Sequence, residues 1–274
     1  MLLDWPIRKN GTGFETGVPE IVTAKRAGQV SAGDVATRLH AVDWPVVTRE
    51  LDNQGCALIE GVLSPAECTA LSALYAQDNL FRSEVVMSRH GFGRGEYKYF
   101  SYPLPETVAA LRAELYPPLV PIANRWNVLI GSTATFPARH SQFLKRCHDA
   151  GQDRPTPLLL QYGEGDYNCL HQDLYGEHVF PLQVAFLLSA PGRDFSGGEF
   201  VLTEQRPRMQ SRPQVVPLGQ GDAVVFAVNY RPAKGSRGHY RVTMRHGVSR
   251  LRTGKRHTLG IIFHDACDAH ASHS

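Results

Sequence analysis

Apolar and polar residues alternate with a period of two in short runs between residues 158 and 263. Such alternation predicts half-buried β-strands, and the glycine-rich segments between the runs, such as Gly219-Gln220-Gly221-Asp222, predict turns. The eight predicted strands are 158–162, 167–171, 182–188, 199–203, 214–218, 223–228, 242–248 and 257–263. Eight short strands with no helix between them are typical of a double-sheet jelly roll or a related β-helix barrel.

The segment before residue 83 contains one strong helix signal. A strand predicted at 56–59 precedes a helix that begins at Ser64, with Pro65 at its first position. Glu67 lies three residues after Ser64, which is the spacing of a capping box. The apolar residues that follow lie on one helical face, so we expect this helix to pack on a sheet.

Two further helical segments are predicted. A short helix at 32–39 lies in an N-terminal stretch that is otherwise weakly patterned. A longer helix at 106–115 should end at Pro117 and Pro118, because proline removes a backbone donor inside a helix, and a second helical piece should follow through Trp126.

The stretch from 83 to 102 mixes glycine with basic and aromatic residues. One interpretation is a mobile loop or hairpin that covers a substrate, since aromatic faces stack planar rings and basic side chains hold phosphates. The other is an ordinary β-hairpin whose aromatic residues form cross-strand pairs. Under the first interpretation, the candidate substrate-binding residues are Arg89, Phe92, Arg94 and Tyr97.

These elements predict one α+β domain that is mostly β with flanking helices and has a double-stranded β-helix (jelly roll) core. We expect a peripheral N-terminal arm at 1–50 and a helical and loop extension at 51–157 that packs on the barrel. The core itself should span 158–264, with a tail at 265–274.

Composition changes this picture little. No apolar run approaches the ~18 residues of a membrane-spanning helix, and the opening MLLDWPIRKN lacks the pattern of a signal peptide, so we expect a cytoplasmic protein without a membrane partner. The five cysteines form no CxxC pair and indicate neither a disulfide framework nor a zinc ribbon.

Charge is unevenly distributed although the net charge is only +3. Between residues 205 and 263 there are twelve Lys or Arg residues and a single acid, Asp222. This segment favours an anionic substrate, with a solvated basic face as the alternative.

Three residues carry the candidate chemistry. His171 and Asp173 form an H-x-D triplet at the end of the second predicted strand, and His246 lies on the seventh, which in an antiparallel double sheet can return beside the second. Two imidazoles and one carboxylate on one face of a metal form the ligand set of non-haem Fe(II) oxygenases, and zinc is the alternative on ligand type alone. We therefore predict a metal site at His171, Asp173 and His246.

Arg256 is the candidate anchor for a carboxylate co-substrate. It lies ten residues after His246, on the neighbouring strand, and a guanidinium matches a carboxylate with two parallel hydrogen bonds. Tyr162 and Thr258 could each add a hydroxyl to that carboxylate, or could be packed strand residues.

Four segments of the chain follow one another in this order: QYGEGDYNCLHQD, SGGEF, GQGDAVVF and HGVSRLRTGKRHTLGIIF. Together they carry a resemblance: the chain resembles the catalytic domain of the 2-oxoglutarate/Fe(II) dioxygenase superfamily, particularly its prolyl-hydroxylase-like branch. The resemblance covers roughly residues 158–264 and implies iron on the H-x-D triplet and the distal histidine, with 2-oxoglutarate on Arg256. It further implies O2 as oxidant, with ascorbate supporting turnover. The HQD context is also similar to AlkB-type dealkylases, which place the arginine further from the distal histidine.

The substrate is left open between three classes. A nucleic-acid base in DNA or RNA, alkylated or not, is favoured by the basic segment and by a predicted loop at 229–240, which adds the candidates Arg231, Arg237 and Tyr240. The resemblance favours a peptide or prolyl substrate, and a small molecule is the third class. A metal-binding, cupin-like sensor without catalysis is the alternative from a different functional class, and the oligomeric state is open.

Overall fold

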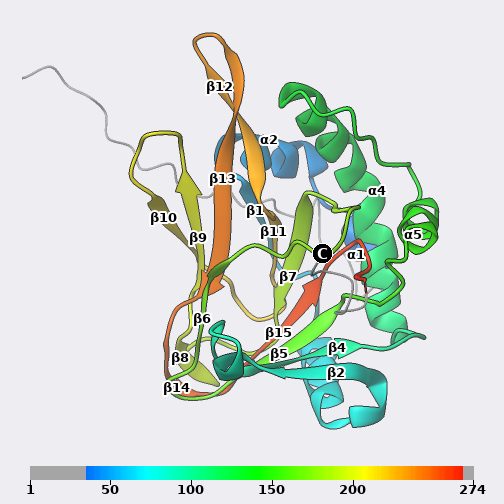
Figure 1. Ribbon diagram of the computed structural model, residues 1–274. Coiled ribbons are helices and arrows are strands. Elements are labelled where there is room, and N and C mark those ends of the chain that lie inside the picture. The colour runs from blue at the N-terminus through cyan, green and yellow to red at the C-terminus, as the bar shows by residue number, and fades with distance from the viewer. Residues whose placement is uncertain (1–34, 268–274) are drawn as a thin grey trace, which may run out of the picture.

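The computed structural model describes residues 35–267. Two antiparallel sheets face each other, and the helices lie on the outer side of one of them (Figure 1). The seven-stranded sheet has the order β1 (Cys56–Ile59), β11 (Ala223–Ala227), β7 (Leu182–Leu187), β15 (Arg256–Ile261), β5 (Leu158–Tyr162), β4 (Glu96–Phe100) and β2 (Phe81–Val86). The predicted double-stranded β-helix with flanking helices is thus confirmed.

The second sheet has six strands. Its order is β10 (Arg212–Val216), β9 (Phe200–Gln205), β13 (Gly238–Val248), β6 (Tyr167–His171) and β3 (Gly93–Arg94), and β12 (Tyr230–Gly235) pairs with β13. A small sheet joins β8 (Phe195–Gly197) to β14 (Leu251–Gly254).

The seven-stranded sheet is covered on both faces along its inner strand β7, which has no exposed position. Val184 and Phe186 face the helices and join their core, whereas Ala185 and Leu187 face the other sheet. Successive side chains of a strand point to opposite faces, so one short strand contributes to two cores. The inter-sheet core includes Phe200 and Leu202 and is the layer in which the site lies.

Five α-helices are described: α1 (Val35–His40), α2 (Trp44–Gln54), α3 (Pro65–Ala73), α4 (Glu106–Leu129) and α5 (His140–Asp149). The capping box of α3 is present as predicted. The predicted helix at 32–39 corresponds in part to α1, and its first residues lie outside the described range. Nothing in the sequence analysis predicted α2. None of the helices described has the length and apolar content that crossing a membrane requires.

The predicted helix end at Pro117 and Pro118 is wrong, because α4 continues through both prolines and through Pro121 to Leu129. An interior proline costs about 3 kcal/mol. Burial compensates for this cost: the helix carries Tyr116 and Trp126 in fully buried positions. Tertiary packing has therefore overridden the local helix-breaking signal.

The predicted loop at 229–240 is also wrong. Its residues form β12 and the start of β13, which pair from Tyr230↔Thr243 to Gly235↔Gly238. By contrast, the stretch from 83 to 102 forms a hairpin of β2 and β4, a conformation that both interpretations of that stretch allow.

A buried ion pair connects α4 to the end of the chain. Arg112 Nη2 lies 2.7 Å from Asp265 Oδ1, and both side chains are almost fully buried. Arg112 also donates to the Ile262 carbonyl, while Tyr102 and His148 contact the second carboxylate oxygen. Burial alone would raise the pKa of Asp265, but Arg112 and these hydrogen bonds lower it.

Replacing Arg112 with leucine should therefore destabilise the fold by about 3–5 kcal/mol, because it leaves the Asp265 carboxylate buried without its cation. Urea unfolding at neutral pH measures this change. The pKa of Asp265 is depressed in the folded state, so the contribution is present above the ordinary carboxyl pKa of about 4 and is lost as the pH falls below it.

The matched control is Lys145→Gln, which breaks the exposed pair of Lys145 with Asp149 and should change stability by less than about 1 kcal/mol. Similar losses for the two variants would show that the Arg112–Asp265 pair does not hold the chain end on α4.

Candidate active site

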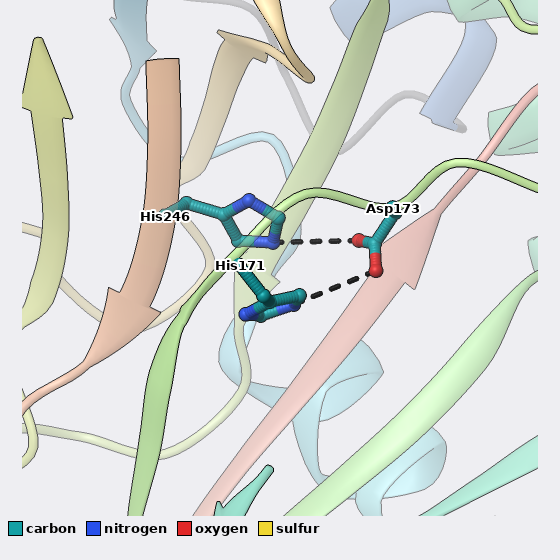
Figure 2. A group of neighbouring side chains, drawn as sticks. All are labelled: His171, Asp173 and His246. Atoms are coloured by element: carbon teal, nitrogen blue, oxygen red, sulfur yellow. Dashed lines mark ion pairs between the residues drawn. The ribbon is translucent and has the colours of Figure 1, made fainter. Parts of the chain in front are cut away.

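Strand pairing brings the two candidate histidines together. In the register of β6 with β13, His171 lies opposite His246, as expected for the second and seventh predicted strands. Their ring centroids are 4.2 Å apart. Asp173 follows β6 in the next segment, and its side chain turns back toward both rings (Figure 2).

The three side chains form one compact donor group. His171 Nε2 lies 3.4 Å from Asp173 Oδ1, and His246 Nε2 lies 3.4 Å from Asp173 Oδ2. One donor atom from each residue lies within 4.8 Å of the others, a spacing that suits a shared metal ion. Two imidazoles and a carboxylate are suitable ligands for divalent iron.

His171 is held in the tautomer that a metal requires. Its Nδ1 lies 2.8 Å from the Cys169 carbonyl oxygen. Since a carbonyl oxygen only accepts, Nδ1 carries the hydrogen and Nε2 keeps its lone pair for a ligand bond. The backbone of β6 thus orients this donor.

A chain of two tyrosines positions the carboxylate. Tyr175 donates its hydroxyl hydrogen to Asp173 Oδ1 over 2.9 Å, and the hydroxyls of Tyr99 and Tyr175 are 2.9 Å apart. Burial alone would raise the pKa of Asp173, but the two imidazoles lower it well below the ordinary value. The carboxylate is therefore ionised and available as a ligand at neutral pH.

A cavity of about 230 Å³ opens beside the donor group, between the two sheets. All three donor residues line it. Aromatic side chains of Phe92, Tyr97, Tyr99 and Tyr175 form one part of its wall, and Tyr162, Gln183, Arg256 and Thr258 supply polar groups elsewhere in it.

Arg256 is a buried cation facing this cavity. Its side chain is 1% exposed, and Nη1 donates to Thr258 Oγ1 over 2.5 Å. The guanidinium carbon lies 5.6 Å from the centre of the Tyr162 ring. Burial lowers the pKa of Arg256 to about 10, so the group remains charged at neutral pH. No carboxylate among the described residues forms an ion pair with it, and Nε has no hydrogen-bond partner.

The position of Arg256 corrects one detail of the sequence analysis. It lies on β15 of the seven-stranded sheet, paired with Tyr162 on β5, and not on a strand next to β13. Arg256 thus reaches the cavity from the sheet opposite to the one that carries His246. This placement lets a ligand between the sheets contact both the donor group and the guanidinium.

Three further polar atoms of residues lining the cavity are buried without hydrogen-bond partners within residues 35–267: the Tyr162 hydroxyl oxygen, Gln183 Oε1 and His246 Nδ1. Leaving such groups unpaired costs about 1–3 kcal/mol each. The Tyr162 hydroxyl and the guanidinium of Arg256 can both donate hydrogen bonds to a carboxylate, so this part of the cavity fits one end of a small dicarboxylate, whereas Gln183 Oε1 can only accept. The residues present thus fit both the metal and the co-substrate that the sequence implied.

The other predicted residues are divided between the cavity and the surface. Phe92 and Tyr97 line the cavity, and Phe92 is 48% exposed at its edge, stacked on His90. Arg89 and Arg94 do not line it; Arg94 lies beside a separate polar pocket, with Nε 3.8 Å from Asp166.

Two other predicted substrate-binding residues do not line the cavity. Arg231 is 2% exposed and forms an ion pair with Glu204, so it is removed from the substrate-binding set. Tyr240 is partly buried, packs against the helical core and does not line the cavity, so it is also removed from this set. Arg237, in contrast, is exposed between β12 and β13.

Tyr99, Tyr175 and Gln183 line the cavity and were not among the predicted site residues, although each had a signal. Tyr99 lies two positions after Tyr97 on one strand, so the two share a face. Gln183 is the one polar residue of the apolar run LQVAFL, and Tyr175 lies two residues after Asp173.

A family model described as Oxygenase-NA, "Oxygenase, catalysing oxidative methylation of damaged DNA", matches residues 95–266. Two uncharacterized proteins of Mycobacterium tuberculosis, from strains CDC 1551 / Oshkosh and ATCC 25618 / H37Rv, are each 50% identical to this chain over 167 residues. The match covers 61% of this chain and 72% of each relative.

Solved structures resemble the fold. A prolyl hydroxylase from Trichoplax adhaerens, in complex with a hypoxia inducible factor oxygen degradation domain peptide fragment, has a TM-score of 0.50 and 14% identity, covering 84% of this chain and 93% of that chain. A 2OG-Fe(II) oxygenase family oxidoreductase from Burkholderia pseudomallei has a TM-score of 0.46 and 17% identity, covering 90% and 99%. At these identities the likeness concerns the fold alone.

Removing either imidazole should remove the metal site. Loss of a residue that only supports a metal ligand weakens metal binding by roughly 10–100-fold. Because His171→Ala and His246→Ala each remove a ligand itself, we expect them to weaken binding of one Fe(II) or Co(II) ion by more than that. Anaerobic calorimetry measures the affinity and circular dichroism checks the fold. His239→Ala, at an exposed histidine of the same strand, is the control and should bind as wild type does. Unchanged stoichiometry in both site variants would contradict the ligand assignment.

Proposed function

Because the chain belongs to the Oxygenase-NA family, within the superfamily of 2-oxoglutarate/Fe(II) oxygenases, we propose that it oxidises an alkylated nucleic-acid base. The proposal assigns iron to His171, Asp173 and His246 and the far carboxylate of 2-oxoglutarate to Arg256. The observation that supports this cofactor assignment is the buried guanidinium of Arg256, which has no carboxylate partner within residues 35–267 and faces the same cavity as the three metal donors.

When bound, Fe(II) with 2-oxoglutarate and O2 supplies hydroxylation of a C–H bond, with succinate and CO2 as co-products. On an N-methyl group the hydroxylated product is a hemiaminal, which releases formaldehyde. Ascorbate supports turnover by keeping the metal reduced. In this proposal the segment 158–264 supplies the metal donors and Arg256, and the earlier residues complete the two sheets with β1, β2, β3 and β4.

The chain's own residues supply position and charge. Arg256 and the Thr258 hydroxyl hold one end of the co-substrate in a part of the cavity closed to water, where a charge-assisted pair is strong. Tyr175 donates a hydrogen bond to the Asp173 carboxylate and would hold this ligand in one orientation toward the metal.

The cavity wall supports a planar substrate. Tyr97 and Tyr99 meet edge to face with their centroids 5.4 Å apart, and Phe92 stands exposed at the edge. Aromatic side chains of this kind stack bases that have left the helical stack, as enzymes acting on a base require. The family description points the same way, whereas the likeness to prolyl hydroxylases concerns the fold and supports no peptide substrate.

The proposed activity is tested by incubating the protein with Fe(II), ascorbate and 2-oxoglutarate, together with oligonucleotides that carry one N-methylated base. Expected products are succinate, formaldehyde and an oligonucleotide lighter by one methylene group. Proline-containing peptides serve as the competing substrate. Peptide hydroxylation without oligonucleotide repair would overturn the substrate class, and absence of succinate under every condition would favour the metal-binding sensor.

Arg256→Ala should raise the 2-oxoglutarate concentration needed for half-maximal turnover by about 30-fold or more, since losing one partner of a buried charge pair costs about 2–5 kcal/mol. Titrating 2-oxoglutarate against succinate formation measures it. Arg256→Lys keeps the charge without the fork and should give an intermediate value. An unaltered requirement in Arg256→Ala would contradict the assignment of Arg256 as the anchor.

A further inference from the structure

The hairpin of β12 and β13 has an unusual charge composition. Residues 229–248 contain five Lys or Arg residues and no Asp or Glu. The hairpin projects beyond the body of the six-stranded sheet (Figure 1). A basic element without acids produces a positive potential that is not cancelled locally, which attracts polyanions.

Alternation along the hairpin separates two faces. The inward face carries buried residues, among them Arg231, Ala233, Val242 and Met244, and it ends at His246 of the metal group. The opposite face carries the exposed residues, because neighbouring strand positions point to opposite sides and paired positions share a side. On that outward face the register pairs Lys234 with His239.

The cations of the outward face are free to bind a partner. We call Lys234, Arg237, Arg241 and Arg245 the basic row; all four are exposed. The fifth cation, Arg231, is neutralised by Glu204 in the interior. Within residues 35–267, no carboxylate forms an ion pair with any member of the basic row. Arg241 instead lies over the exposed Tyr230 ring, 5.8 Å from its centroid.

The base of the hairpin is tied to the metal group. Gln172, which separates His171 from Asp173 and lines the cavity, donates to the carbonyl oxygens of Met244 (2.8 Å) and Asn229 (3.2 Å). Asn229 and Met244 also form a backbone hydrogen bond of 2.7 Å. A molecule bound on the hairpin is therefore held at a fixed position relative to the site.

We propose that the basic row binds the sugar-phosphate backbone of the nucleic-acid substrate and thereby positions the target base for entry into the cavity. This inference rests on the proposed function. Arg241 and Arg245 lie on one face of β13 about 14 Å apart, at ~3.4 Å per residue. Over that length one strand of a duplex presents about four phosphates, so both cations can be matched. The contacts read charge and not sequence.

The test compares two triple variants that lose the same charge. The hairpin variant is Lys234→Gln/Arg237→Gln/Arg241→Gln. The control is Arg139→Gln/Lys145→Gln/Arg146→Gln, at exposed cations on and beside α5, away from the hairpin (Figure 1). Binding of a fluorescent duplex with one N-methylated base is measured by anisotropy at several salt concentrations, and thermal unfolding confirms that both variants fold.

The hairpin variant should bind the duplex about tenfold or more weakly than wild type at low salt. The slope of log affinity against log salt concentration should be smaller in magnitude by about 2 to 3, because each phosphate contact contributes about 0.9 to that slope. The control should keep the wild-type slope. Equal slopes for the two variants, while wild type repairs the oligonucleotide, would overturn the hairpin assignment alone.

Two other outcomes would also overturn it. If wild type forms succinate but binds no duplex, the substrate class and the hairpin proposal fail together, and the oxygenase class stands. If the hairpin variant loses binding to anionic vesicles or to an acidic peptide while its binding to the duplex is unchanged, the basic row serves a different partner.

Discussion

The pairing of β6 with β13 is the constraint on which the site depends. It sets His171 opposite His246 and leaves Asp173 to return between them from the following segment. A slip of one residue would turn a histidine to the outer face. Pairing of β13 with β9 over six residue pairs, and with β12 over another six, holds the register. The donor geometry is therefore built into a sheet, which positions side chains more accurately than a loop does.

Arg256 imposes a second constraint, which works against stability. A buried guanidinium without a carboxylate is costly, and the Thr258 hydroxyl and the Tyr162 ring offset only part of that cost. The pKa of about 10 leaves it charged at neutral pH. The remaining cost disappears when a ligand brings a carboxylate to the guanidinium. An arrangement that destabilises the empty protein thus strengthens the binding of one kind of ligand.

The sequence predicted the sheets well because most strands alternate or are bounded by clear turns. Each of the eight predicted strands overlaps an observed one, and the donor group could be found because H-x-D lies at a strand end. Local rules failed where tertiary contacts outweigh them. The prolines of α4 lie in a helix held by buried Tyr116 and Trp126, and the glycines of β12–β13 suggested a loop. The burial of Arg231 could not be predicted from the sequence, because its ion-pair partner Glu204 lies on another strand.

One strand joins the chemistry to the charge. Because β13 alternates, its inward positions deliver His246 to the metal group, while its outward positions carry Arg241 and Arg245. The same register therefore fixes the distance between the reacting centre and the exposed cations, and no separate domain is needed to align a polyanion with the cavity. The buried ion pair of Arg231 with Glu204 joins the base of β12 to β9, so the hairpin that carries these cations is anchored on the sheet that carries His246.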